Sequence, residues 1–152
     1  MDSQDQITTL NTLTATLIDS VTGYEDAASN AEGNRFQEIF RQRATERNQA
    51  VEELRSEVRR LGGNPEDDGS FLGKTHQRIL DLKAAVTGRD DQAIINEVER
   101  GEDYLKEKFE TALNGDTLTG DARAAVERAY QSVRSGHDQI SQLKHGMEAS
   151  AS

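Results

Sequence analysis

The sequence predicts an all-α protein, a four-helix bundle in which a short additional helix crosses between the second and third long helices. Two observations favour this fold class. The chain has one proline and no cysteine among its 152 residues, so few residues interrupt a helix. Apolar residues also recur at helical spacing in four long blocks. Short glycine-containing turns and one long polar segment separate these blocks and set the order of the helices.

The first block predicts a helix over residues 6–30. Ser3 and Gln6 have the spacing of a capping box at its start. Residues 6–18 carry no charge, which is unusual in so charged a chain. Two interpretations stay open for this stretch: a contact surface for another subunit, and a mere bias of composition. The apolar face of this helix consists of Ile7, Leu10, Leu17, Val21, Tyr24 and Ala28.

The second block predicts a helix that follows a turn at Gly33 and ends at Gly62 and Gly63. The paired glycines favour a left-handed C-terminal cap, because glycine adopts positive φ without a steric penalty. The apolar residues of this helix are Phe36, Phe40, Ala50, Val51, Leu54, Val58 and Leu61.

The long polar segment over residues 62–70 contains the single proline and is the strongest helix-breaking stretch in the chain. A short helix is predicted after it, over residues 71–86. A helix of about 16 residues spans ~24 Å at ~1.5 Å per residue, enough with its loop to return the chain along most of the bundle. The second and third long helices can therefore run in the same direction. The result is an up-down-down-up bundle, the topology of ferritin-like proteins.

The last two blocks predict a helix from Asp90, its N-cap, to the turn at Asn114 and Gly115, and another from Thr119 that frays after Gly146. We expect one domain over residues 1–146 and a disordered tail over residues 147–152. The apolar faces of the two helices consist of Ala93, Ile94, Val98, Leu105, Phe109 and Ala112 in the former, and Ala122, Val126, Ala129, Val133 and Ile140 in the latter.

Several stretches of the chain resemble a known family. They are GYEDAA at 23–28, ERNQAVEEL at 46–54, LGGNPEDDGS at 61–70, ERGEDY at 99–104 and HDQI at 137–140. Together they are similar to a bacterial family of ferritin-like four-helix-bundle proteins classed as a domain of unknown function. The resemblance covers almost the whole chain and implies an architecture, but it implies no activity.

Ferritin-like di-iron proteins take one glutamate from each of two helices and a Glu-x-x-His pair from each of the other two. The matching positions here are Glu25, Glu46 with Gln49, Glu99 or Glu102, and Arg134 with His137. Gln49 stands where a histidine is expected and Arg134 stands where an anion is expected, so both pairs are damaged. The remaining candidate ligands for iron or manganese are Glu25, Glu46, Glu102 and His137.

The height of each candidate along its helix and the direction in which it faces separate these residues. Counted from a turn near residue 32, Glu25 and Glu46 differ in height by ~10 Å at ~1.5 Å per residue, too far to share a metal. Glu102 lies inside the apolar stripe of its helix, taking ~100° per residue. Arg43 and Arg47 occupy the centre of the stripe on the second helix, and Arg47 lies at a similar height to Glu102.

We therefore expect a buried or half-buried ion pair between Arg47 and Glu102, joined by Arg43 or His137. The planar guanidinium can donate to both oxygens of one carboxylate, and a core arginine also repels a metal cation. Gly101 and Gly136 either make room for this arginine, permit a close approach of two helices, or are tolerated weaknesses of their helices. His137 is a candidate ligand, proton shuttle or pH sensor, or else a hydrogen-bonded histidine at the core edge.

Composition bounds the partners and the compartment. A net charge of −10 and a pI near 4.8 argue against nucleic acid and anionic lipid, which bind clustered lysine and arginine. Without cysteine there is no disulfide, thiolate nucleophile or sulfur-ligated zinc. No apolar run approaches the ~18 residues of a membrane span, and the first thirty residues lack the features of a signal peptide. We expect a cytoplasmic protein that binds neither nucleic acid nor membrane.

Catalytic motifs are absent from the sequence. It contains no glycine-rich phosphate loop, no GxSxG elbow and no HExxH pair. The sequence thus favours a structural or interaction module that is not an enzyme and whose partner is a second copy of itself or another protein. The alternative is a metal-binding protein that retains a degraded di-iron-like site.

Overall fold

The computed structural model describes residues 3–65 and 91–151, which form four long α-helices and no strand. These helices are α1 (Ser3–Asn30), α2 (Asn34–Arg60), α4 (Asp91–Asn114) and α5 (Gly120–Ala151). The all-α prediction is confirmed for this part of the chain. The short helix predicted over residues 71–86 lies outside the described residues.

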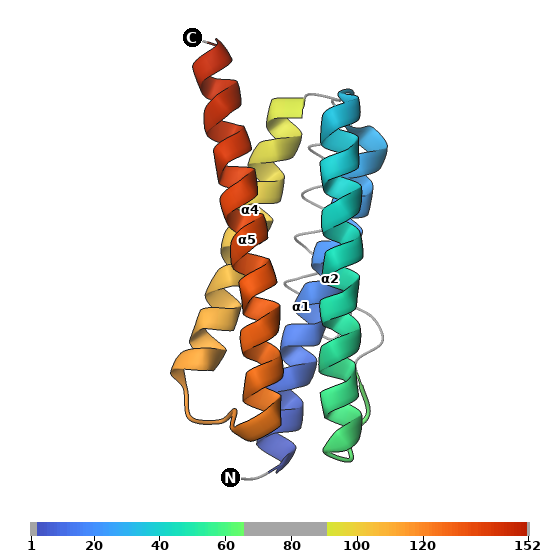
Figure 1. The fold of residues 1–152 in the computed structure, drawn as a ribbon, viewed down its shortest axis with the longest axis vertical. Helices are drawn as coiled ribbons and strands as arrows, with labels where there is room; N and C mark the ends of the chain where they lie inside the picture. Colours follow the sequence, from blue (N-terminus) through green and yellow to red (C-terminus); the bar gives the residue numbers. More distant parts are fainter. Residues whose placement is uncertain (1–2, 66–90, 152) are drawn as a thin grey trace.

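The four helices lie side by side, as Figure 1 shows. In that view α1 and α5 run upward, whereas α2 and α4 run downward. The α1–α2 and α4–α5 pairs pack most closely, and α2 also contacts α5 while α1 contacts α4. Among the described helices, α2 and α4 make no close backbone contact. These two helices therefore lie on a diagonal of the bundle, so a side-chain contact between them passes through its centre.

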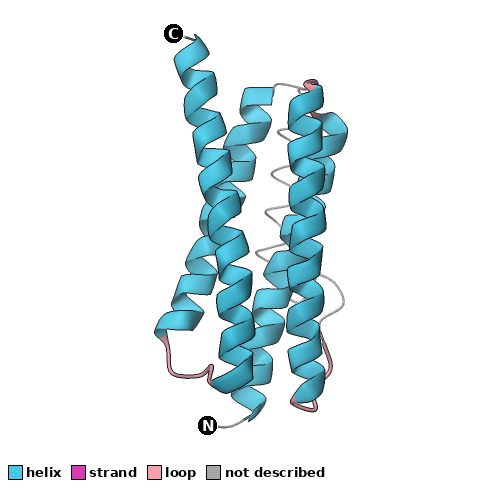
Figure 2. Cartoon of the chain, viewed as in Figure 1, coloured by secondary structure: helices cyan, strands magenta, loops and turns pink. Residues whose placement is uncertain are grey.

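Short loops join the helices of each close pair, and Figure 2 shows the α4–α5 loop at the lower end of the bundle. At the end of α2, Gly62 has φ of 87°. Its N–H donates to Arg59 O at 3.0 Å, and the N–H of Gly63 donates to Val58 O at 2.9 Å. This pair of hydrogen bonds is a Schellman motif, which confirms the predicted left-handed cap.

Two polar side chains connect helix ends that are distant in the sequence. Gln6 does not form the predicted box with Ser3; its Oε1 accepts the N–H of Thr119 at 3.0 Å, beside the start of α5. Asp91, the first residue of α4, accepts the N–H of Glu32 at 2.9 Å and that of Gly33 at 3.1 Å. Each carbonyl or carboxylate oxygen satisfies a backbone donor that a helix cannot satisfy by itself.

The uncharged half of α1 is buried within the chain. Residues 13–17 are all buried, and Thr8 is the one exposed residue between 6 and 18. The hydroxyls of Thr14 and Thr16 donate to carbonyls one turn earlier, at 2.7 and 3.0 Å, which satisfies them without a partner from another helix. Burial within the chain therefore suffices to account for the missing charge in this stretch.

The core consists of two hydrophobic clusters. One includes Phe40 and Ile140, at the end of the bundle where α1 turns into α2. The other includes Leu54 and Phe109, toward the opposite end. Arg47 and Glu102 are buried, belong to neither cluster, and fall between them along α2 and α4.

Two further observations concern the described helices. α5 continues to Ala151, through residues for which the sequence predicted a tail; alanine, methionine and glutamate there all favour helix. None of the described helices combines the length and apolar character required to cross a bilayer.

Candidate functional site

The centre of the bundle holds a buried ion pair. Arg47 of α2 donates from Nη1 to Glu102 Oε1 and from Nη2 to Glu102 Oε2, both at 2.6 Å. The side chains are 0% and 2% exposed. Two parallel hydrogen bonds of this kind are the strongest geometry available to an arginine and a carboxylate. Because α2 and α4 are diagonal, the pair links two helices whose backbones are not in close contact.

The other two helices complete this polar layer. Ser20 of α1 accepts a hydrogen bond from Arg47 Nη1 at 2.8 Å, and the Val133 carbonyl of α5 accepts a long one from Nη2 at 3.5 Å. The Tyr24 ring of α1 lies against the guanidinium, with 5.5 Å between its centroid and Arg47 Cζ. This distance is within the range of a cation–π contact. All four described helices thus contribute to one layer around a single cation.

Burial and charge act in opposite directions on Arg47. Burial by itself lowers the pKa of the guanidinium, but the charge and hydrogen bonds of Glu102 outweigh it and raise the pKa above its ordinary value. Burial, and then the charge of Glu102, raises the pKa of Tyr24 well above its ordinary value. The layer therefore contains one cation, one anion and a neutral phenol, and its net charge is zero.

One buried donor in this layer, Arg47 Nε, has no hydrogen-bond partner within the described part of the chain. An unpaired buried donor destabilises a fold by about 1–3 kcal/mol. The layer is thus held by four of the five guanidinium N–H groups rather than by all of them.

Gly136 of α5 gives the ion pair its space. A Cβ atom at this position would collide with Arg47 Nη2 and lie 2.9 Å from Glu102 Oε2. Gly101, in contrast, has no heavy atom within 4 Å of the position that its Cβ would occupy. Of the two glycines that the sequence singled out, only Gly136 packs against the arginine.

Arg43 and Glu46 form a separate contact between α2 and α5. Arg43 donates to Glu46 Oε2 at 3.0 Å and to Gln139 Oε1 at 2.8 Å. Glu46 Oε1 accepts the hydroxyl hydrogen of Ser132 at 2.6 Å. Both side chains lie toward the edge of the bundle, with 12% and 42% exposure, so Arg43 does not join the buried pair.

His137 and Glu25 lie in still other places. His137 Nε2 is 2.6 Å from Asp103 Oδ1 across the α4–α5 seam, and its Nδ1 is 3.4 Å from Asp138 Oδ1. Glu25 is exposed and lines a groove between α1 and α2. The structure thus does not bring Glu25, Glu46, Glu102 and His137 together. Within the described ranges, no three histidine, aspartate or glutamate side chains are arranged to hold a metal ion.

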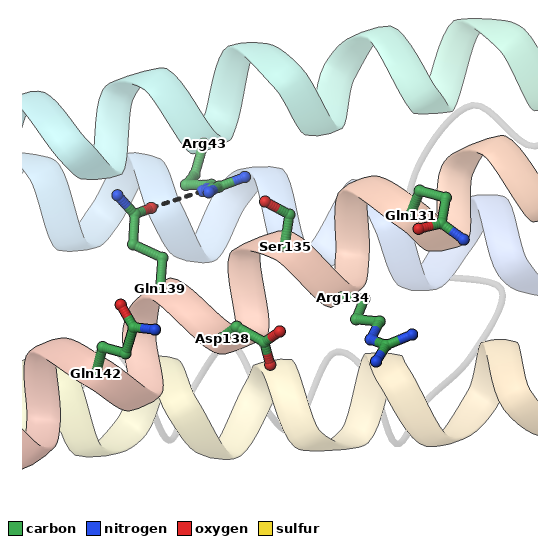
Figure 3. Close-up of a pocket in the computed structure, with 7 residues that line it drawn as sticks. All are labelled: Arg43, Gln131, Arg134, Ser135, Asp138, Gln139 and Gln142. Carbon is green, nitrogen blue, oxygen red and sulfur yellow. Dashed lines mark hydrogen bonds between the residues drawn. The ribbon is translucent and has the colours of Figure 1, made fainter.

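A polar groove runs along α5 and includes Arg43 of α2, as Figure 3 shows. It encloses about 470 Å³ and is lined on α5 by Gln131, Arg134, Ser135, Asp138, Gln139 and Gln142. In this view Arg43 approaches from α2, whereas Arg134 projects toward α4. The groove offers amides, a hydroxyl and charges to a polar ligand, and its side chains form no pair of nucleophile and base.

Sequence reasoning did not identify several members of these contacts. Ser20 and Tyr24 complete the Arg47 layer, Asp103 is the partner of His137, and Ser132 is the partner of Glu46. The available signal was weak: Tyr24 lies on the apolar face of its helix and Ser20 lies one turn before it.

Comparison with known proteins adds a family. A model described as "Domain of unknown function (DUF2383)" matches residues 5–115, which include most of α1 and all of α2 and α4 but end before α5. Both members of the buried ion pair lie within the matched residues. No curated protein matches the chain.

Proposed function

Because the chain belongs to the family described as a domain of unknown function (DUF2383), which supplies no activity, we propose from the geometry that it is a non-catalytic structural or interaction module. In this proposal it is a ferritin-like up-down-down-up bundle, completed by a short crossover helix, and its polar centre is a structural ion pair. One observation carries the proposal. The fully buried Arg47 takes both oxygens of Glu102, the carboxylate best placed to face a metal.

The chemistry of this pair supports a structural role. Carboxylates in di-metal bundles point toward cations that they bind through their oxygens. Here a guanidinium donates to both oxygens of Glu102, and its charge opposes the entry of a second cation at the same place. Glu25 and Glu46 lie outside the layer, and Glu46 is already engaged by Arg43 and Ser132.

The surface supports partners that recognise polar groups. Among the described residues, Ala124 is the one apolar residue that is largely exposed, and others such as Phe36, Ile39 and Leu143 are half-buried. Obligate interfaces are rich in exposed apolar side chains. With a net charge of −10, the module would bind a partner, or a second copy of itself, mainly through charged and hydrogen-bonding side chains.

The test combines metal binding with the stability of variants. Apo protein is titrated anaerobically with ferrous iron, manganese or zinc while its melting temperature is measured. We expect no stoichiometric metal and no rise in melting temperature. Stoichiometric metal, with a rise that Glu102→Ala abolishes, would contradict the proposal in favour of a metal-binding protein, since a ligand that binds only the native state must stabilise it.

The same variants test the ion pair. Glu102→Ala and Arg47→Ala should each lower the free energy of unfolding by about 3–5 kcal/mol, because each leaves an uncompensated charge in the core. The double variant Arg47→Met/Glu102→Leu removes both charges and should recover most of that loss. A loss of less than about 1 kcal/mol for Arg47→Ala would rule out a structural role for the pair.

A further inference from the structure

We propose that the centre of the bundle is a receptor for a planar guanidinium cation, which the chain fills with its own Arg47 side chain. The inference rests on the proposed structural ion pair and extends it to a binding specificity. A structural pair requires only opposite charges, and a lysine could supply one of them. A receptor requires acceptors, a face and a shape that fit one kind of cation, and the layer around Arg47 has all three.

The acceptors match the fork of a guanidinium. Nη1 donates to Glu102 Oε1 at 2.6 Å and to Ser20 Oγ at 2.8 Å, while Nη2 donates to Glu102 Oε2 at 2.6 Å and lies 3.5 Å from Val133 O. These acceptors come from α4, α1 and α5, so α2 contributes only the cation. An ammonium group carries its three donors on one atom and cannot reach two such sets at once.

The face and the shape match a flat group. The Tyr24 ring centroid lies 5.5 Å from the guanidinium carbon, within the range of a cation–π contact. On the α5 side Gly136 leaves a space that even one methyl group would fill, since a Cβ there would collide with Nη2. Neither feature is needed to neutralise Glu102, so both point to recognition of the guanidinium itself.

Removal of the Arg47 side chain should therefore leave a site for a free ligand. Alanine retains Cβ, and the atoms that are lost beyond it correspond to N-ethylguanidinium. Three remaining helices would still present the acceptors, the ring and the space. We expect Arg47→Ala to bind N-ethylguanidinium at millimolar concentrations. Ethylammonium, with the same charge but no fork, and N-ethylurea, flat but uncharged, should bind far more weakly.

The experiment measures the melting temperature of Arg47→Ala with each of the three compounds, at concentrations far below those that denature proteins. N-ethylguanidinium should raise it saturably, by a few degrees at about tenfold excess over Kd, with little response from the wild type. Arg47→Met is the matched control, because its side chain fills the space and should abolish the response. If Arg47→Ala is unfolded, recovery of the far-ultraviolet helical signal on adding the ligand is the readout.

The outcomes separate this proposal from the structural ion pair. Equal responses to all three compounds, or no response to any, would overturn the receptor. If Arg47→Ala is strongly destabilised but responds to none of the compounds, the receptor proposal is wrong and the structural ion pair still stands. An Arg47→Ala variant as stable as the wild type would overturn both.

Discussion

At the scale of single residues, the space beside Gly136 distinguishes it from the other helical glycine near the polar layer. Gly136 lies against Arg47 and Glu102, whereas Gly101 faces open space. Glycine within a helix destabilises it by about 1 kcal/mol relative to alanine. The structure explains this penalty only at Gly136, where a larger side chain would collide with the ion pair.

Alanine at each position tests this difference. We expect Gly136→Ala to lower the free energy of unfolding by about 1–3 kcal/mol, because the added methyl forces the ion pair to shift. Gly101→Ala should leave it unchanged or raise it by up to about 1 kcal/mol. Urea unfolding of the two variants gives both values, and a Gly136→Ala variant as stable as Gly101→Ala would show that the methyl is accommodated.

The candidate site was predictable only in part, and the reason is also residue-scale. Helical angle and axial height place Arg47 and Glu102 toward the centre at one level, and their ion pair follows from those two quantities. The partners of His137 and Glu46 depend instead on the lateral distance between α5 and its neighbouring helices. The residue pattern of a single helix carries no information about that distance. Asp103 and Ser132 were therefore found only in the structure.

At the scale of helices, three polar contacts join α5 to α4. Residues of α5 spaced by seven, Tyr130, His137 and Lys144, contact Glu110, Asp103 and Glu99 of α4. A spacing of seven returns a side chain to nearly the same face of a helix. The α4–α5 seam is thus lined by acceptors on one helix and by donors or a histidine on the other.

The contact of Tyr130 with Glu110 makes one part of this seam sensitive to pH. The phenol donates to Glu110 Oε2 at 2.6 Å, and this hydrogen bond is the main cause that lowers the pKa of Glu110. A lowered folded-state pKa contributes stability above the ordinary glutamate pKa, and that stability is lost as the pH falls through the folded value. The same bond raises the pKa of Tyr130, so its contribution is also lost as the pH rises above the ordinary tyrosine range.

Tyr130→Phe removes the bond while it keeps the ring. We expect the pKa of Glu110 to rise toward its ordinary value in this variant, as followed by NMR titration of its carboxyl carbon. The stability difference between wild type and variant should shrink in acid below the ordinary glutamate pKa. An unchanged Glu110 titration would mean that Lys106 and Arg134, the neighbouring cations, dominate instead.

The side chain of Asp91 links α4 to the turn between α1 and α2. Its carboxylate accepts two backbone N–H groups of the α1–α2 turn, so it ties the start of α4 to that turn. Asp91→Ala should leave both donors without this acceptor and lower the free energy of unfolding by about 1–3 kcal/mol. Faster amide hydrogen exchange at Glu32 and Gly33 checks the mechanism, and exchange that stays at the wild-type rate would contradict it.

At the scale of the whole molecule, the scarcity of proline and the recurrence of apolar residues at helical spacing were enough to predict four long helices. Burial was harder to predict, because α1 is covered on all sides along residues 13–17 although its apolar pattern shows a single face. The hydroxyls of Thr14 and Thr16 donate to carbonyls of the same helix, so these polar residues are buried without a partner from another helix. The apolar pattern therefore underestimated how deeply this helix lies in the bundle.

The net charge of the chain leads to a prediction about association. Two copies of net charge −10 repel one another, and salt screens that repulsion, with a Debye length of about 10 Å at 0.1 M and about 3 Å at 1 M. We therefore expect self-association to strengthen with salt, so light scattering after size-exclusion chromatography should show the mass per particle rising above 16.8 kDa as salt is raised. A mass per particle that falls as salt is raised would mean that attraction between opposite charges holds the copies together, and would contradict the prediction.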